Sequence, residues 1–495
     1  MAQEIELKLA LAEQGWRSFS RHPALRDAAE PPHTQTLRNL YFDTADLALR
    51  RQRVALRLRR AGRQWLQTVK CASSAQAGLS SRPEWEQPFS GHFDFSQIED
   101  AALRSELEAL RDRGALSAVF DTDFERREWR FSAGGGELLL MADRGHILAG
   151  GRRETISEIE LELAGAPVEA LLELAGRLAE TLPLRAESRS KAQRGYDLMA
   201  GAEPVPVRAG RSPIDPDGSA AAAFRAVALD CIAHYQANEH GALHSDAPEF
   251  IHQMRVALRR LRSALRVFAP ALPTAAAETL AMHLRALASE LGELRDRDVL
   301  QTELLAPVIA SAPDVALLDL ERTLRSARAA RRDRVLAALQ DGRQARLMIA
   351  LLSLLQQPDI DHAPSLRKLA RKRLASAHRR MIRAAHRARG GDIDTLHALR
   401  IDVKRLRYAI EFFLPLLDAE RTRQTLDTLS EAQESLGFLN DLSQAGPRLL
   451  AAAGNSEELL SAVSRIAAHH MPRYRTVVDR APCLLRALSH LPAPR

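Results

Sequence analysis

Cysteine, long apolar runs and aromatic residues are all scarce in this sequence. Three cysteines, Cys71, Cys231 and Cys483, lie far apart and form no C-x-x-C pair, which argues against a disulfide framework and against a zinc site. The longest apolar stretch, residues 347–355, is interrupted by Ser353 and suits a buried helix better than a membrane span. The N-terminus lacks the basic and apolar regions of a signal peptide, so we expect a cytoplasmic protein with no membrane partner.

Two more absences narrow the chemistry. Aromatic residues make up 5% of the chain, which leaves few platforms on which nucleobases could stack. The sequence also lacks the glycine-rich phosphate loop G-x-x-x-x-G-K-S/T. A phosphate-binding site would therefore rest on charged side chains, and we do not expect nucleic acid as a partner.

The chain is long, and its charge is unevenly distributed. Its 495 residues predict two or three domains. Residues 1–200 hold 28 Lys and Arg against 30 Asp and Glu, a balance of −2, whereas residues 201–495 hold 42 against 33, a balance of +9. The positive excess of the second part predicts a polyanionic partner.

Residues 1–200 have the pattern of an antiparallel β domain with a few helices. After an opening strand at residues 4–9, alternating strand patterns cover residues 36–43, 53–61, 64–71, 82–89, 119–131, 137–148 and 155–163. Helical patterns cover residues 13–21, 98–111 and 168–181. The mixture predicts an α+β domain.

Charged residues share one face of several predicted strands. These faces carry Glu4, Glu6 and Lys8; Arg57 and Arg59; Thr68 and Lys70; Glu84 and Glu86; and Glu158, Glu160 and Glu162, with Arg126 and Asp143 on two further strands. A solvated sheet face would interleave acids and bases between neighbouring strands. Segregation of the charges strand by strand instead predicts a closed barrel whose charges line a wet tunnel.

The side chains of such a tunnel predict phosphate chemistry. Cations suited to a chain of phosphates are Lys8, Arg57, Arg59, Lys70, Arg126 and Lys191. Hard oxygen ligands suited to Mg²⁺ or Mn²⁺ are Glu4, Glu6, Glu160 and Glu162. A site that holds both carboxylates and cations is chemically reasonable if a divalent metal bridges the carboxylates to a phosphorylated substrate.

The motifs of this part resemble the CYTH family of triphosphate tunnel metalloenzymes. They are Glu4-Ile5-Glu6-Leu7-Lys8, Tyr41-Phe42-Asp43-Thr44, Leu56-Arg57-Leu58-Arg59, Arg82-Pro83-Glu84-Trp85-Glu86, Ile159-Glu160-Leu161-Glu162-Leu163 and residues 190–196. The resemblance covers residues 1–200. It implies an eight-stranded antiparallel tunnel with flanking helices, a divalent metal, and hydrolysis or cyclisation of a triphosphate.

Residue roles follow from the same resemblance. It implies catalytic roles for Glu4, Glu6, Lys8, Lys70 and Glu86. It implies substrate binding by Lys8, Arg57, Arg59, Lys70, Arg126 and Lys191, and metal binding by Glu4, Glu6, Asp143, Glu160 and Glu162. The chain departs from the family at residues 141–143, where methionine replaces the usual leucine near the aspartate. Which of Glu158, Glu160 and Glu162 bind metal stays open, because all three share a face.

Beyond residue 200 the composition changes to helical Ala, Leu and Arg. Residues 201–217 are rich in Pro and Gly and predict an interdomain linker before a helical domain at residues 218–495. His252–Arg262 recurs as His397–Arg407, and Leu291–Asp296 recurs as Leu436–Asp441, both at an offset of 145 residues. Equal offsets predict duplicated helical bundles at about residues 218–360 and 361–495.

Each copy of the repeat carries one basic helix face. The two faces consist of His252, Arg255, Arg259 and Arg262, and of His397, Arg400, Lys404 and Arg407. A merely solvated face is the alternative, but the duplication, the few acids at i±4 and the paired histidines favour a binding surface. No Cys or second His stands nearby to complete a metal site. Histidines with a pKa near ~6.5 would strengthen anion binding below neutral pH.

These repeats resemble the CHAD domain over residues 218–495. The resemblance implies two pseudo-symmetric four-helix bundles whose basic central surface binds inorganic polyphosphate. It assigns that binding to His252, Arg255, Arg259, Arg262, His397, Arg400, Lys404 and Arg407. A CYTH domain followed by a CHAD domain is the order found in bacterial inorganic triphosphatases.

We therefore expect a metal-dependent inorganic triphosphatase that uses Mg²⁺ or Mn²⁺ to convert tripolyphosphate to pyrophosphate and phosphate. The expected partners are inorganic triphosphate and polyphosphate, with association with polyphosphate granules. Thiamine triphosphatase or adenylate cyclase activity is one alternative, and a non-catalytic protein that binds polyphosphate or nucleic acid is another. The sequence leaves open the oligomeric state, the preferred polyphosphate length and any regulation of one domain by the other.

Overall fold

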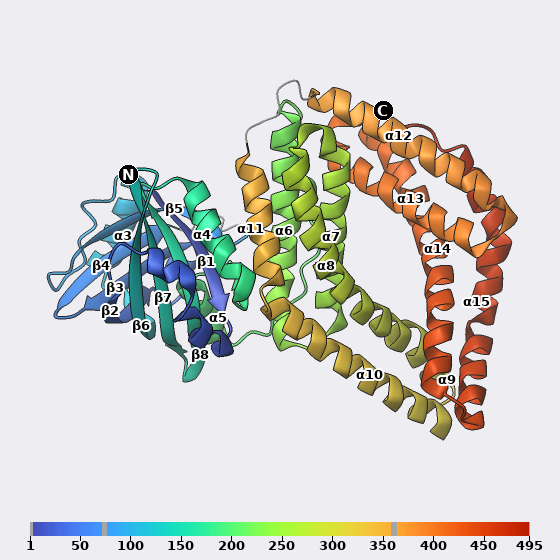
Figure 1. Ribbon diagram of the computed structural model, residues 1–495, viewed down its shortest axis with the longest axis horizontal. Helices are drawn as coiled ribbons and strands as arrows, with labels where there is room; N and C mark the ends of the chain where they lie inside the picture. The colour runs from blue at the N-terminus through green and yellow to red at the C-terminus, as the bar shows by residue number, and fades with distance from the viewer. Residues whose placement is uncertain (1–2, 72–76, 358–363, 495) are drawn as a thin grey trace. The chain divides into compact units, whose positions relative to one another are not determined.

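The computed structural model describes residues 3–71, 77–357 and 364–494, and of these the side chains of residues 3, 4, 61, 81 and 82 are not described. The chain divides into two compact units (Figure 1). The first consists of Met1–Pro204 with Ala338–Gln356, and the second of Val205–Ala337 with Gln357–Arg495.

The first unit is built on one antiparallel sheet, which has nine strands among the described residues. They are β1 (Gln3–Leu11), β2 (His33–Asp43), β3 (Val54–Ala61), β4 (Gln64–Cys71), β5 (Leu79–Pro88), β6 (Ser117–Ala133), β7 (Gly136–Ala149), β8 (Arg152–Ala164) and β9 (Leu184–Ala186). The order is β5-β4-β3-β2-β6-β7-β8-β1-β9, and β1 also pairs with β5. Eight strands therefore close into a ring, and β9 extends from β1.

Helices and short turns surround this ring. They are η1 (Glu13–Gly15), α1 (Trp16–Phe19), η2 (Pro23–Asp27), α2 (Ala48–Arg51), α3 (Ala101–Asp112), α4 (Val168–Thr181), α5 (Lys191–Ala200) and α11 (Arg343–Gln356). Asp100 caps α3 by accepting hydrogen bonds from Ala102 N and Leu103 N. Ser190 caps α5 by accepting one from Gln193 N, which fixes Lys191 in the first helical turn.

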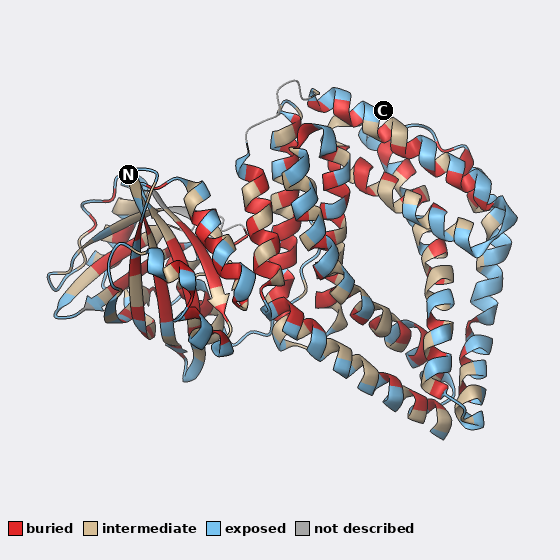
Figure 2. Cartoon of the chain, in the orientation of Figure 1, coloured by how far each residue is buried: buried red, intermediate tan, exposed pale blue. Residues whose placement is uncertain are grey.

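Buried residues recur along the strands (Figure 2), and the apolar ones form separate clusters against the sheet. On one side, Leu56 and Val69 of the sheet pack with Leu107 of α3 in a buried cluster. In another cluster, Phe124 of β6 packs with Tyr196 of α5. Because side chains alternate along a strand, the faces opposite Leu56 and Val69 are left to the charged residues inside the ring.

The predicted α+β fold of this part is confirmed, with additions. All eight predicted strands are present, and closure of the ring agrees with the charge segregation. The ninth strand, β9, was not predicted because three residues after Pro183 are too short to show an alternation. The predicted helix at residues 13–21 is the shorter pair η1 and α1.

Helix α11 packs with α4 and β9 in the first unit, although the sequence analysis assigned its residues to the helical domain. The side-chain amide of Gln344 accepts a hydrogen bond from Ala186 N at 2.7 Å and donates one to Ala186 O at 3.4 Å. Its leucines, among them Leu347 and Leu351, are fully buried. Strand β9, which pairs with β1, is therefore supported by a helix from much later in the chain.

The second unit is helical, as predicted. Its elements are α6 (Ala220–His244), α7 (Pro248–Phe268), η3 (Ala269–Ala271), α8 (Thr274–Val299), η4 (Leu300–Leu305), α9 (Ala306–Ser311), α10 (Val315–Gln340), α12 (Leu366–Arg387), η5 (Ala388–Gly390), α13 (Ile393–Phe413), η6 (Leu414–Leu416), α14 (Ala419–Ala453) and α15 (Glu457–Ser489). Helices α13 and α14 begin 145 residues after α7 and α8. The turn η6 begins 145 residues after η3, so the sequence repeat is a structural repeat.

The predicted linker is partly fixed to the second unit. Val207 N donates to Asn238 Oδ1 of α6 at 2.9 Å, and Asn238 Nδ2 donates to Val207 O at 2.9 Å. His234 Nε2 lies 3.0 Å from the same carbonyl oxygen. These contacts hold one extended residue of the proline-rich segment against α6.

Among the described residues, the helices of both units are too short or too polar to span a membrane.

Candidate functional site

The charged faces of the strands surround a cavity of about 710 Å³ inside the first unit. This volume is typical of small-ligand sites. The predicted site residues that line it are Glu6, Lys8, Arg57, Arg59, Lys70, Glu86, Arg126, Glu160, Glu162 and Lys191. Asp143 lies behind this lining, where it contacts Arg126 and Lys191. Glu4 belongs to β1, but its side chain lies outside the described ones.

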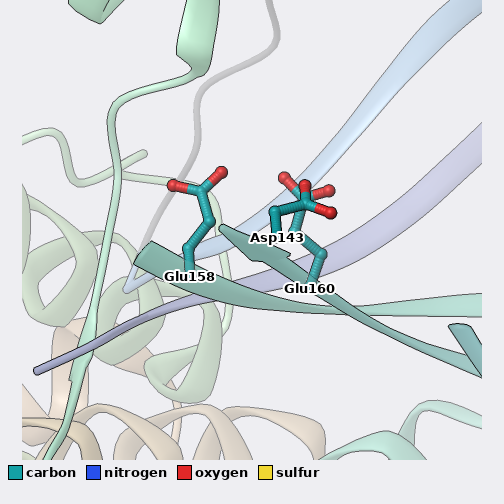
Figure 3. A group of neighbouring side chains, drawn as sticks. All are labelled: Asp143, Glu158 and Glu160. Atoms are coloured by element: carbon teal, nitrogen blue, oxygen red, sulfur yellow. The ribbon is translucent and has the colours of Figure 1, made fainter. Parts of the chain in front are cut away.

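Three buried carboxylates form an acidic cluster on β7 and β8, namely Asp143, Glu158 and Glu160 (Figure 3). Asp143 pairs directly with Glu158 across the two strands, and Glu160 lies two residues further along the same face. One oxygen from each side chain lies within 4.8 Å of the others. A group of oxygen-only donors this close together fits a hard divalent cation such as Mg²⁺.

Two cations hold the acidic cluster together. Arg126 donates to both oxygens of Asp143 at 2.7 Å and to Glu160 at 2.7 Å. Lys191 donates to Asp143 at 2.7 Å and to Glu160 at 3.0 Å, and it also contacts Glu158. The remaining guanidinium nitrogen of Arg126 contacts Met141 Sδ, so the methionine that departs from the family pattern packs against a substrate-binding candidate.

Burial and pairing shift the protonation of these groups. Burial alone would raise the pKa of Glu160, but Lys191, Lys8 and Arg126 outweigh it and hold that pKa well below its usual value. Burial would lower the pKa of Lys191, yet Asp143, Glu158 and Glu160 raise it. Glu160 and Lys191 are therefore both charged at neutral pH, which suits the binding of a metal and of a phosphate.

The wall opposite β7 and β8 in the ring is rich in cations. It is formed by β3 and β4, which carry Arg57, Arg59 and Lys70. Lys70 lies 2.8 Å from Glu84, but Arg57 and Arg59 lie 3.8 Å from Glu84 and Glu86. Glu86 also accepts a hydrogen bond from Thr68 at 2.8 Å. The two arginines are thus held more loosely than Arg126.

Arg57 is the most distinctive residue of this wall. Its side chain is buried, and its Nε and Nη2 atoms have no hydrogen-bond partner among the described residues. Unmet donors of a buried guanidinium are costly unless an anion satisfies them. Burial, with Arg57 and Arg126 nearby, lowers the pKa of its neighbour Arg59 to about 10. The wall therefore carries buried arginine donors at the cavity lining that its own carboxylates do not reach at hydrogen-bond distance.

The first strand links the two walls. Lys8 lies 3.7 Å from Glu6 and 3.4 Å from Glu160, and these acids raise its pKa against the effect of burial. Glu6 accepts a hydrogen bond from Ser80 at 3.2 Å. Sequence reasoning left the role of Glu158 open and assigned none to Glu84 or Tyr41, which also line or border the site. The only sequence signal for these residues was that they share a strand face with other site residues, and a shared face does not show how deeply a side chain is buried.

In the second unit, the two predicted basic faces meet between α7 and α13. Arg259 of α7 donates to Tyr408 Oη of α13 at 2.6 Å. The charge of Arg259 acts on Arg400 and on Lys404, which belong to the other face. Arg255 packs where Gly292 of α8 lacks a side chain, since a Cβ there would lie 2.5 Å from Arg255 Nη1. We call Arg255, Arg259, Arg400 and Lys404 the basic surface.

The other predicted members of these faces lie differently. Arg262 is exposed, and His397 bonds to Asn440 at 2.9 Å. Arg407 donates to Glu411 at 2.7 Å, so its charge is neutralised by an acid at i+4. Asp296, whose role was open, lies 3.1 Å from Arg448 of the other repeat.

Crowding changes the protonation of the basic surface. Burial, then Arg259 and Arg400, lower the pKa of Lys404 to about 7. Burial, then Arg295, lower the pKa of His252 to about 4, so the expectation of a titration near neutral pH is wrong for this histidine. The basic surface therefore carries more positive charge than the nearby acids balance.

Comparison with known proteins agrees with this geometry. The CYTH domain matches residues 2–196, and the CHAD domain matches residues 226–450. An inorganic triphosphatase of Haemophilus influenzae is 34% identical over 204 residues, which are 40% of this chain and 55% of that protein. The match thus spans about half the length of that relative.

Two further relatives cover the helical part. The crystal structure of the CHAD domain from the plant Ricinus communis is 32% identical, with a TM-score of 0.51, and the match covers 59% of this chain and 99% of that one. An uncharacterized protein of Mycobacterium tuberculosis strain H37Rv is 28% identical over 435 residues, which are 82% of this chain and 81% of that protein.

Proposed function

For this chain, which joins a CYTH domain to a CHAD domain, we propose metal-dependent hydrolysis of inorganic triphosphate to pyrophosphate and phosphate, with polyphosphate bound by the helical unit. The similarity of the first part to an inorganic triphosphatase supports the reaction class. The observation that carries the proposal is the pair of opposed walls, one with clustered carboxylates and one with unpartnered arginine donors.

Substrate binding is assigned to the cation-rich wall. The unpartnered Nε and Nη2 atoms of Arg57 would donate to phosphate oxygens. Arg59 would exchange Glu86 for substrate at little cost, because that contact is 3.8 Å long, and Lys70 would exchange its closer partner Glu84 at 2.8 Å. Charge on the bridging and leaving oxygens would be stabilised by the same side chains as the phosphoryl group transfers.

Metal binding is assigned to the carboxylate side, where the residues fit the ion. The acidic cluster would hold Mg²⁺ or Mn²⁺, with Glu6 and Glu162 at the cavity lining and Glu4 in the same strand as Glu6. A bound ion would supply charge neutralisation and polarisation of the phosphoryl group. Lys191 and Arg126 contact both this cluster and the cavity, so they would orient the carboxylates and contact the substrate.

The aromatic residues of the cavity favour a bare phosphate chain over a nucleotide. Tyr41 stacks on Phe120 with ring centroids 4.5 Å apart. The ring of Phe124 has Lys191 at 5.1 Å and Arg126 at 5.7 Å from its centroid, and Arg50 lies over Tyr196. Each of these rings therefore already has another ring or a cation against it, which leaves less ring surface for a base to stack on.

The test incubates the full chain and Mg²⁺ separately with tripolyphosphate, ATP and thiamine triphosphate. Phosphate release is measured for each substrate, and the products are identified. Faster release from tripolyphosphate than from the other two supports the proposal. Preference for thiamine triphosphate, or formation of cyclic AMP from ATP, would assign a different activity to the tunnel.

Binding of polyphosphate is assigned to the basic surface. Its four cations lie together on α7 and α13, and the lowered pKa values of Arg255, Arg400 and Lys404 indicate charge that an external anion would relieve. A flexible polyanion gains affinity from many such contacts, and the affinity falls as salt rises. Competition between polyphosphate and RNA for the full chain tests the choice of ligand, because equal competition would favour a general polyanion site.

A further inference from the structure

A second cavity, of about 1110 Å³, lies among α13, α14 and α15 within the second unit. Its lining is largely apolar and includes Leu436, Leu439 and Val478. Tyr474 and Val478 of α15 are each 41% exposed, and much of α15 faces solvent (Figure 2). Large apolar side chains that line a cavity and reach solvent mark a binding surface more often than a solvated one. We call this cavity the apolar groove.

The first repeat fills the equivalent position with ion pairs. From α10, Arg328 Nε donates to Asp298 at 2.6 Å, and Nη1 donates to Asp246 at 2.9 Å. Arg331 donates to Glu290 at 2.6 Å, and Arg332 donates to the carbonyl oxygen of Ser245 at 2.6 Å. Long arginine side chains thus bridge α10 to α8 and to the end of α6.

The second repeat has lost this network. At the offset of 145 residues that relates α7 and α8 to α13 and α14, Asp246, Glu290 and Asp298 correspond to Gly391, Ser435 and Ser443. On α15, the guanidinium of Arg473 lies 4.2 Å from the ring centroid of Phe438. Gly391 and Ser443 line the groove. The space that arginines bridge in one repeat is therefore left open and apolar in the other.

The rim of the groove carries positive charge. Arg389 and Arg486 line it, together with His397 and His490, against the single lining acid Asp394. An apolar floor favours burial of hydrocarbon, and a cationic rim favours an anionic group at the end of it. A neutral apolar ligand would leave the rim unused, and inorganic phosphate would leave the floor unused.

We propose that the apolar groove between α13, α14 and α15 binds an amphiphilic anion, namely an alkyl chain that ends in a carboxylate or a phosphate. The alkyl chain lies along Leu436, Leu439 and Val478, and the anionic end contacts Arg389 or Arg486. This site is separate from the tunnel and does not depend on its activity.

The experiment is a fluorescence titration of the full chain with anilinonaphthalene sulfonate, an aromatic anion of this amphiphilic kind. Laurate and dodecyl phosphate compete as the two anionic forms, and dodecanol competes as the uncharged control. Ala481 lines the groove, so Ala481→Trp fills it, whereas Ala467 is exposed on α15 outside the lining and Ala467→Trp is the matched control. Ser443→Asp restores the acid that pairs with arginine in the first repeat.

We expect saturable binding that laurate or dodecyl phosphate displaces, and the better competitor identifies the head group. Ala481→Trp and Ser443→Asp each weaken probe binding at least about tenfold, while Ala467→Trp leaves it unchanged. Circular dichroism of each variant confirms that it is folded. The proposal is overturned if both groove variants bind the probe like the wild type, or if dodecanol competes as well as laurate. It is also overturned if tripolyphosphate displaces the probe. A further contrary result would be that the chain self-associates, that this self-association produces the fluorescence signal, and that Ala481→Trp abolishes it.

Discussion

Lys191 and Arg126 in the tunnel and Arg400 and Lys404 on the basic surface have opposite electrostatic surroundings. In the tunnel, carboxylates raise the pKa of Lys191 and Arg126 despite burial. On the basic surface, burial and neighbouring cations lower the pKa of Lys404 to about 7 and also lower that of Arg400. Carboxylates therefore outweigh burial for these two tunnel cations, whereas on the basic surface the effect of Asp296 and Asp441 is smaller than that of burial and neighbouring cations.

The strongest test of this difference is removal of the uncompensated charge. Replacing Arg255, Arg259, Arg400 and Lys404 together with Ala should lower polyphosphate affinity about 100-fold or more and flatten its salt dependence. The reason is that each cation contributes to the electrostatic attraction of the phosphates, which salt weakens. The measurement is a binding titration at several salt concentrations. The matched control replaces the exposed Arg322, Arg325, Arg421 and Arg423, which removes the same charge elsewhere. Equal losses in both variants would show that net charge, not this surface, binds the ligand.

In the tunnel, Glu160→Gln should reduce triphosphatase activity about 100-fold at limiting Mg²⁺. Glu160 contacts Lys8, Arg126 and Lys191 and belongs to the acidic cluster, so its loss weakens metal binding. The measurement is the rate of phosphate release from tripolyphosphate across a Mg²⁺ titration. Glu125→Gln, an exposed change on the same sheet, is the control. Activity at the wild-type level throughout the titration would remove Glu160 from the metal site.

On the opposite wall, Arg57→Ala should lower kcat/KM about tenfold to 100-fold, with a raised KM and a lowered kcat. The reason is that its unpartnered donors would contact both the bound substrate and the transition state. Steady-state kinetics with tripolyphosphate measure both constants. Arg60→Ala, an exposed neighbour on β3, should change neither. Unchanged kinetics for Arg57→Ala would place the phosphates elsewhere.

Polyphosphate binding should depend on pH through Lys404. Its pKa is about 7 in the free protein, and a bound anion raises that pKa. Lys404 then takes up a proton on binding, so affinity is highest below about pH 7 and falls by at most about tenfold per unit as the pH rises above it. Lys404→Arg, which stays charged, should flatten the profile between about pH 6 and pH 9. A wild-type profile that is already flat would contradict the shift.

The smallest expected effect is a difference in stability between alanine substitutions at Gly292 and Gly437, which are equivalent positions in the two repeats. Gly437→Ala should raise stability by about 1 kcal/mol, because alanine favours a helix interior and a Cβ there meets nothing within 4 Å. Gly292→Ala should gain less and should weaken polyphosphate binding, because its Cβ would displace Arg255. Thermal unfolding and a binding titration measure the two effects. Equal effects of the two substitutions would show that Gly292 does not position Arg255.

Much of this arrangement could be predicted from sequence, for identifiable reasons. Alternation along the strands showed that Arg57, Glu160 and Lys8 share the inside of a barrel, because side chains in a strand alternate strictly. The repeat offset showed that α7 and α13 are equivalent. Both signals depend on local periodicity, which the fold preserves.

Other features depend on depth and on contacts between distant residues. The lowered pKa of His252 follows from burial and from Arg295 of α8, which a face diagram does not show. The ion pair between Arg126 and Asp143 joins β6 to β7, so neither residue reveals it alone. The acidic partner of Arg407 could have been predicted from sequence, because Glu411 stands at i+4.

The opposed-wall account is tested most directly by tripolyphosphate affinity measured without metal, in EDTA, for wild type, Arg57→Ala and Glu160→Gln. We predict that the wild type binds, that Arg57→Ala weakens binding at least about tenfold, and that Glu160→Gln binds as tightly as the wild type or more tightly, because one negative charge has gone. Loss of binding in Glu160→Gln with full binding in Arg57→Ala would reverse the assignment of the two walls and contradict the account.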